Sequence, residues 1–201
     1  MLKLQSLYLK ADVRLIVRQS QTACGFACTH IMSGQPSKPA PANYIAFTAP
    51  INPPSASPVL TYAQIWQGLE RKIRAGQDFV GGAIVSTDVI STSSTEHGNP
   101  ITVREVVFRD GNRRVQEKCI AFEPMKVEFH QPNGSKVQNV ISQDADGNLY
   151  MTYTFEWLHY ELEDDEAGLK AAKDKEWMTA KMAVEKTIEV MREMVQDGRI
   201  K

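Results

Sequence analysis

Cysteine, long apolar runs and an excess of basic charge are all scarce in this sequence. The three cysteines are an odd number and widely spread, so they predict no disulfide framework and suit a reducing compartment. No stretch approaches the roughly 18 consecutive apolar residues that a membrane-spanning helix requires. The net charge of −1 provides no basic footprint for nucleic acid or anionic lipid. We therefore expect a cytoplasmic protein that binds no nucleic acid and does not span a membrane.

Recognised catalytic motifs are lacking as well. The chain has no nucleophile elbow, phosphate-binding loop, dinucleotide fingerprint or zinc motif. Cys24, Cys28 and His30 could be soft metal ligands, but a fourth ligand is missing. We expect no cofactor and no metal. The composition itself is that of one globular domain, because 42% of the 201 residues are hydrophobic and 23% are charged.

The first forty residues differ from the rest. Residues 1–31 contain four basic residues and one acidic residue, and residues 33–43 are rich in proline and small polar residues. A mitochondrial targeting segment is one interpretation, since such segments are basic and amphipathic. A disordered extension ahead of a start at Met32, followed by a linker, is the interpretation we favour. We expect residues 1–40 to be this extension and residues 41–201 to be a small-molecule-binding domain.

The order of predicted elements indicates an α+β domain with an antiparallel sheet. Thr61 and Gln64 form a capping-box pattern, which predicts a helix that begins there and ends at Gly76. Apolar spacing of three or four residues predicts a second, long helix over about 167–197. Strands are expected at 44–49, 83–92, 101–109, 113–121, 125–131, 136–143 and 149–159.

The last strand and the last helix predict a cavity. Large apolar residues occupy alternate positions of the strand and therefore share one face, whereas threonines and Glu156 occupy the other. The helix carries an apolar stripe from Trp177 to Val195. A bulky sheet face followed by such a helix is typical of a curved sheet that wraps the helix and leaves a ligand cavity. The ligand-binding candidates are Trp66, Arg104, Met151, Tyr153, Phe155, Trp157, Trp177, Val184 and Ile188.

The hairpin at residues 101–121 can be aligned by charge. A two-residue turn at Asp110-Gly111 places Arg104 opposite Glu117, a four-residue loop places Glu105 opposite Lys118, and a three-residue loop places Glu105 against Glu117. Facing like charges are unfavourable, and Asp-Gly suits the two-residue turn, which we prefer. An inward Arg104–Glu117 pair would be a polar anchor for a ligand, whereas an exposed pair would be structural only.

The acid–base candidates are Glu105, Glu156 and His159. Because Glu105 follows Arg104 on a strand, only one of the two can point inward. Glu156 opposes the aromatic face unless a bulge turns it inward, where a carboxylate would have a raised pKa. His159 continues the inward parity of Trp157 at the strand end, and a histidine can transfer protons near neutral pH.

Three segments resemble the AtaL-like proteins, a branch of the START and birch-pollen-allergen (SRPBCC, helix-grip) superfamily. These segments are Leu60–Leu69, Arg104–Phe108 and Thr154–Trp157, and the resemblance extends over about residues 42–197. It implies a helix-grip fold, with a curved antiparallel sheet of about seven strands around the C-terminal helix and a hydrophobic cavity. The superfamily includes polyketide cyclases, lyases and carriers of hydrophobic ligands, so the fold does not fix the function. No catalytic residue is carried over.

Two functions therefore remain as hypotheses, and both have a hydrophobic small molecule as the partner. The first is a cofactor-free cyclase or isomerase that acts on a polyketide- or peptide-derived intermediate of secondary metabolism by positioning and proton transfer. The second is a non-catalytic carrier or protector of such a molecule. Inward ionisable residues favour the enzyme, and a lining of methionine and aromatic residues alone favours the carrier. The sequence predicts no particular oligomeric state.

Overall fold

The computed structural model of the protein describes residues 39–201. The expectations for residues 1–38, including those for Cys24, Cys28 and His30, lie outside the described residues. Among residues 39–201, no helix is both long and apolar enough to cross a membrane. The elements are β1 (Ala42–Pro50), α1 (Tyr62–Arg74), η1 (Gly76–Asp78), β2 (Ile84–Ser94), β3 (Pro100–Phe108), η2 (Asp110–Asn112), β4 (Arg114–Phe122), β5 (Lys126–His130), β6 (Lys136–Gln143), β7 (Leu149–Leu158), η3 (Tyr160–Leu162) and α2 (Glu166–Gln196).

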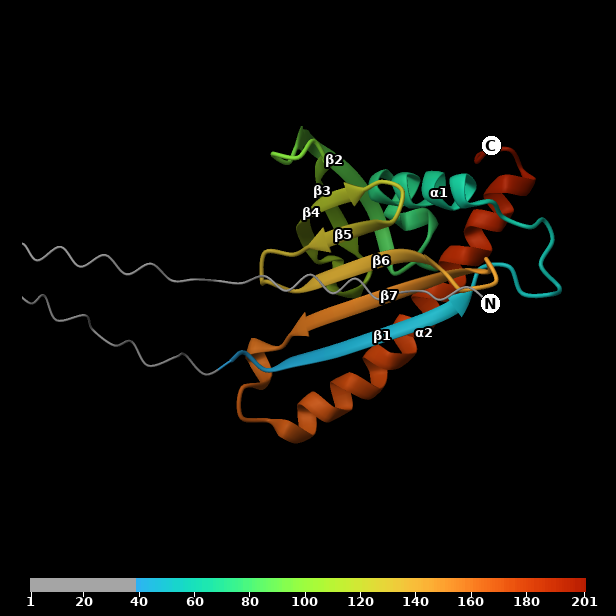
Figure 1. Cartoon of the computed structure of the whole chain (residues 1–201). Helices are drawn as coiled ribbons and strands as arrows, with labels where there is room; N and C mark the ends of the chain where they lie inside the picture. Colours follow the sequence, from blue (N-terminus) through green and yellow to red (C-terminus); the bar gives the residue numbers. More distant parts are fainter. Residues whose placement is uncertain (1–38) are drawn as a thin grey trace, which may run out of the picture. The chain divides into compact units, whose positions relative to one another are not determined.

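Seven strands form one antiparallel sheet in the order β1-β7-β6-β5-β4-β3-β2. From β3 to β7 each strand pairs with the one before it in the chain, and β1 pairs with the last strand, β7. The segment between the two edge strands β1 and β2 contains α1. α2 packs against β1 and β7 and also contacts α1, and Figure 1 shows the sheet curving beside α2. The predicted α+β helix-grip fold is confirmed.

The alternation predicted for β7 is also confirmed. Met151, Tyr153 and Phe155 are buried, whereas Thr152 and Thr154 between them are partly exposed. β7 keeps a regular register with β1 on one side and β6 on the other along this whole stretch. The aromatic face of β7 therefore lies against the core.

The hairpin of β3 and β4 has the predicted register but not the predicted turn. Arg104 lies opposite Glu117, as charge indicated. The turn is wider than two residues, because Phe108 N–H donates to the carbonyl of Arg113 and leaves residues 109–112 outside the ladder. The left-handed φ angles are at Gly111 (62°) and Asn112 (50°). The expected two-residue turn and the observed four-residue turn are both centred between residues 110 and 111, so they give the same strand register.

α1 begins as predicted and ends against the sheet. Thr61 Oγ1 accepts from the Gln64 amide at 3.3 Å, and Gln64 Oε1 accepts from the Thr61 amide at 3.0 Å. Gly76 follows the C-terminal cap Ala75 and begins η1. A Cβ at Gly76 would lie 3.3 Å from Arg104 Nη1. Glycine at this position therefore allows Arg104 to approach the end of the helix. The buried residues of α1 are Ile65, Trp66, Gly68, Leu69, Lys72 and Ile73.

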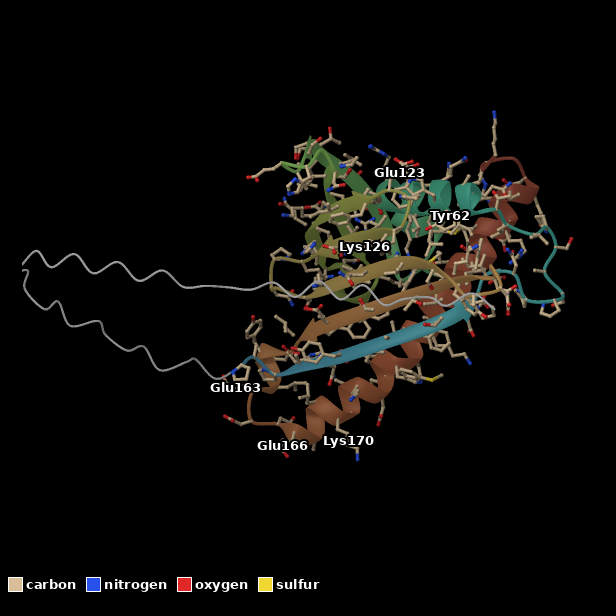
Figure 2. The ribbon with its side chains drawn as sticks, in the orientation of Figure 1. Tyr62, Glu123, Lys126, Glu163, Glu166 and Lys170 are labelled. Atoms are coloured by element: carbon tan, nitrogen blue, oxygen red, sulfur yellow. The ribbon has the colours of Figure 1, made fainter. Side chains whose placement is uncertain are left out.

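The buried stripe of α2 is shorter than predicted. Its buried residues begin at Ala180. Glu166 and Lys170 in its first turns are exposed, as is Glu163 just before the helix (Figure 2). Trp177 is 48% exposed, so the prediction that it belongs to the buried stripe was wrong. Its indole instead meets the ring of Phe47 on the edge strand β1 edge-on, with 6.0 Å between ring centroids. The apolar spacing along α2 thus extends further toward its N-terminus than the part of the helix that packs against the core.

This difference between two positions of α2 can be measured. Ile188, 7% exposed in the core, should cost about 2–5 kcal/mol of unfolding free energy when changed to alanine. Trp177→Ala should cost about 1 kcal/mol, because it loses mainly one edge-on aromatic pair. Urea unfolding of the two variants provides both values. Equal losses would show that α2 is packed along its entire length.

Candidate functional site

A pocket of about 190 Å³ lies between the inward face of the sheet, the end of α1 and the middle of α2. Most of its wall is apolar. The rings of Phe155 and Trp157 are stacked on one side with centroids 4.5 Å apart. Polar groups from α1, β3, β4, β6 and the residue after β5 also line it. These polar residues are Lys72, Arg104, Glu117, Gln131 and Asn139, and the exposed Thr179 of α2 also lines the pocket. The pocket is thus a mostly apolar space with a small set of polar groups, of which Lys72, Arg104, Glu117 and Asn139 are buried.

Arg104 and Glu117 form a buried ion pair across β3 and β4. Arg104 Nη2 and Nε donate to Glu117 Oε2 at 2.6 and 3.0 Å, and both residues are under 5% exposed. Gln131 donates to the second carboxylate oxygen at 3.0 Å. Both charges are therefore hydrogen-bonded within the protein, which is the condition under which a buried pair is tolerated.

The same arginine holds the end of α1. Its Nη1 donates to the carbonyl of Lys72 at 2.8 Å and to that of Ile73 at 2.9 Å. These carbonyls belong to the last turn of the helix, where no later amide within the helix satisfies them and where the helix dipole favours a positive charge. Arg104 therefore fixes the position of Lys72 relative to the sheet.

Lys72 is a buried amine with neutral partners. Its Nζ donates to Tyr153 Oη at 2.9 Å and to Thr187 Oγ1 at 3.0 Å, and it lies 4.5 Å from the centroid of the Tyr153 ring. Burial and the nearby charge of Arg104 lower the pKa of Lys72 to about 7, although Glu117 opposes the shift. Burial also raises the pKa of Tyr153, so the phenol stays protonated. Lys72 can therefore change protonation state near neutral pH while its partners do not.

Asn139 is a buried polar side chain without a partner. It is 0% exposed and lines the pocket, its amide oxygen accepts no hydrogen bond, and its amide nitrogen donates none. An unsatisfied buried polar group typically costs about 1–3 kcal/mol. Such groups are uncommon in native proteins, and a polar group that lines a pocket is available to a ligand.

The ligand-binding candidates from the sequence divide into two sets. Arg104, Phe155 and Trp157 line the pocket. The others lie in the core beside it, except Trp177 of α2, whose ring contacts Phe47 on β1. Tyr153 is connected to the site only through its bond to Lys72. The candidates that do not line the pocket are Trp66, Met151, Tyr153, Trp177, Val184 and Ile188.

Two acid–base candidates lie on the outer face of the sheet. Glu105 pairs with Arg114 at 2.5 Å, and Glu156 pairs with Lys136 at 2.9 Å. β7 is regular through Glu156, so no bulge turns its carboxylate inward. The expectation that these glutamates act inside the cavity is therefore corrected, because strand alternation directs them away from it.

His159, the third candidate, ties the end of β7 to α2. Its ring nitrogens lie 2.7 Å from Glu176 Oε1 and 3.1 Å from Glu161 Oε1, and Asn43 donates to the other oxygen of Glu176 at 2.7 Å. Partial burial works against the charged ring, but the hydrogen bonds and charges of Glu161 and Glu176 raise the pKa of His159. His159 does not line the pocket, and its contact with Glu176 joins the end of β7 to the N-terminal half of α2.

Sequence reasoning did not identify Lys72 or Asn139, although both carried a signal. Lys72 follows Ile65 by seven residues and Leu69 by three, so it lies on the apolar face of α1. Asn139 alternates with Val137 and Ile141 on the inward face of β6. A polar residue at a position where the pattern requires an apolar one was the signal in both cases.

Comparison with known proteins identifies a family. The sequence model of the AtaL family, described as acetylaranotin biosynthesis cluster protein L, matches residues 45–198 and so includes every residue of the pocket. No curated protein matches the chain. Among solved structures the chain is similar to XoxI of Bacillus cereus, with 14% identity, a TM-score of 0.42, and coverage of 80% of this chain and 99% of that one. It is also similar to an AHSA1-like protein of Aeromonas hydrophila, with 11% identity, a TM-score of 0.42, and coverage of 78% and 94%.

The buried ion pair leads to a testable asymmetry. Arg104→Leu should destabilise the protein by about 3–5 kcal/mol, because it leaves the Glu117 carboxylate buried without its partner. Arg104→Leu combined with Glu117→Leu should cost less than the single change, since no charge is then left uncompensated. Urea unfolding of both variants measures the difference. A double variant that is less stable than the single one would show that each residue stabilises the protein independently of the other.

Lys72 should make stability depend on pH in a defined direction. Its pKa falls from 10.5 to about 7 on folding, so the folded protein holds fewer protons than the unfolded chain between these values. The penalty for burying the lysine is therefore complete at and below pH 7 and shrinks as the pH rises to 10. Lys72→Met should be more stable than wild type at pH 7, and the gap should narrow by pH 9.5. A gap that is independent of pH would mean that Lys72 stays charged in the folded protein.

Proposed function

The chain belongs to the AtaL family, and we propose that it binds a hydrophobic small molecule in its pocket and cyclises or isomerises it without a cofactor. Lys72 is the group that transfers the proton. The family description names a biosynthesis cluster, which supports a polyketide- or peptide-derived intermediate as the substrate. The single observation that carries the proposal is a buried amine whose hydrogen-bond partners are neutral, in a mostly apolar pocket.

The geometry at Lys72 suits proton transfer. Two of its N–H groups donate hydrogen bonds to Tyr153 and Thr187, so one of the tetrahedral positions on the nitrogen remains unused by these bonds. That position is a lone pair in the neutral amine and an N–H in the ammonium form. A pKa of about 7 leaves both forms populated near neutral pH, which is the optimum for a general acid–base group.

The reaction follows from these two forms. The neutral amine takes a proton from a carbon next to a substrate carbonyl, and the electron pair of the broken C–H bond moves onto the carbonyl oxygen. In the isomerisation of a β,γ-unsaturated carbonyl compound the ammonium returns the proton to the γ carbon of the resulting dienolate, and the C=C bond moves into conjugation with the carbonyl. In a cyclisation the enolate carbon forms a bond with a second carbonyl carbon, and the ammonium protonates the oxygen of that carbonyl. The apolar walls hold the substrate in place and exclude water.

The ionisable residues of the pocket favour this proposal over a carrier. A carrier needs only an apolar lining, whereas Lys72, Arg104 and Glu117 all line this pocket and are buried. The charge of Arg104 contributes to the low pKa of Lys72, so the ion pair supports the proposed chemistry as well as the fold. A non-catalytic carrier remains the alternative that the experiment separates.

The test is the exchange of C–H protons in a small ketone of suitable size. 2-Indanone in D2O should exchange the protons next to its carbonyl at least about tenfold faster with wild-type protein than with Lys72→Met, since general bases typically contribute 10²–10⁴-fold. The enzymatic rate should rise between pH 6 and pH 8 as the amine of Lys72 loses its proton. Proton NMR measures the exchange.

The matched control is Lys181→Met, which removes an exposed lysine of α2. This variant should exchange 2-indanone at the wild-type rate. If Lys72→Met also matches wild type, Lys72 does not transfer the proton. If 2-indanone binds without any exchange above the rate in buffer, the protein is a carrier.

A further inference from the structure

Asn139 is an exception among the polar residues of the pocket. Lys72, Arg104, Glu117 and Gln131 all have hydrogen-bond partners within the protein. Asn139 has none at either atom of its amide, and it is wholly buried. Within residues 39–201, the other residues with an unpartnered buried side-chain atom lack a bond at one atom only and lie outside the pocket. Asn139 therefore presents a buried donor and a buried acceptor that no group of the described residues satisfies.

We propose that Asn139 recognises a cis secondary amide, as found in a small lactam ring, on the ligand. This inference rests on the proposed function, because it assumes that the pocket binds a small molecule, and it names the class of that molecule. The pair of groups on Asn139 presents one N–H donor and one C=O acceptor side by side. A ligand must supply an acceptor and a donor with the same spacing to satisfy both.

A cis amide supplies this pair in one plane. Its N–H donates to the Asn139 oxygen while its C=O accepts from the Asn139 nitrogen, so two parallel hydrogen bonds form. The ligand must supply one donor and one acceptor whichever way the Asn139 amide is turned, because both its oxygen and its nitrogen are unpartnered. In a trans amide the N–H and C=O point in opposite directions. An ionised carboxylate has acceptors only, and a ketone or ester has no donor.

The surroundings of Asn139 fit a flat ring. Val137 precedes it on the inward face of β6 and pairs with Phe129 on one neighbouring strand and Phe155 on the other, and both of these rings line the pocket. The pocket volume of about 190 Å³ is larger than the roughly 150 Å³ of a cavity that holds benzene. A fused ring system on the order of ten non-hydrogen atoms therefore fits this volume.

Tyr153 connects Asn139 to the proposed proton-transfer group. It pairs with Tyr153 across β6 and β7, and the hydroxyl of Tyr153 accepts from Lys72 Nζ at 2.9 Å. An amide bound to Asn139 is thus held at the same end of the pocket as the amine. Asn139 would orient the amide, and Lys72 would act on an acidic proton next to its carbonyl.

Four probes of nearly equal size test the assignment. Isoquinolin-1(2H)-one contains the cis amide, its N-methyl derivative and isocoumarin lack the donor, and naphthalene lacks both polar groups. Calorimetric titration of the full chain should show the lactam binding at least about tenfold tighter than either donor-less analogue, as expected for one additional buried hydrogen bond. Asn139→Leu should remove this preference and leave the affinity for naphthalene within about twofold of wild type, because the apolar wall is kept.

Asn139→Leu is expected to fold, since it replaces an unsatisfied amide by an apolar side chain of similar size, and its thermal unfolding temperature should not fall. Gln138→Leu is the matched control, because Gln138 is the neighbouring residue on the opposite face of β6 and bonds to Glu128. It should keep the preference for the lactam. If naphthalene binds but wild type does not distinguish the lactam from isocoumarin, the lactam assignment is wrong and the apolar pocket stands. If none of the four probes binds, the proposed function is wrong as well.

Discussion

The buried guanidinium of Arg104 is the interaction on which the rest of this site depends. It joins three elements, because it bonds to Glu117 on β4, extends from β3 and caps the last carbonyls of α1. A buried charge is costly unless its hydrogen bonds are satisfied, and here four of its N–H···O contacts are made within the protein. Arg104 therefore fixes the C-terminal end of α1 against the sheet, and this determines where Lys72 lies.

The proton chemistry of Lys72 follows from the same constraint. A lysine near a carboxylate would keep its charge, but the carboxylate in this site is already bonded to Arg104 and Gln131. Lys72 is left with a phenol and a hydroxyl, so desolvation and the neighbouring guanidinium together favour its neutral form. Gly76 completes the arrangement, since a side chain there would crowd Arg104 Nη1. Ion pair, glycine and lysine thus act as one unit.

Strand and helix periodicity made most of the fold predictable. Alternation in β7 and the capping box of α1 depend on local sequence, and the register of β3 with β4 depends on the charges of facing residues, so all three could be derived. The wide turn at residues 109–112 and the exposure of Trp177 could not, because neither follows from the pattern of apolar and charged residues. Periodicity describes which residues share a face, and it does not say how far along that face the core extends.

The site was harder to predict than the fold because its residues violate the pattern that identifies the fold. Arg104 was found from its neighbour across the hairpin, which is a local relation. Lys72 and Asn139 are far apart in sequence, and only the pairing of β6 with β7 and the packing of α1 bring both close to Tyr153. Polar residues on inward faces reduce stability, so they are expected where function requires them. Glu105 and Glu156 satisfied the simpler rule that acids perform acid–base chemistry, but alternation placed them on the outer face with Arg114 and Lys136. In a sheet with one buried face, the parity of a residue is therefore a stronger guide to its role than its chemical type.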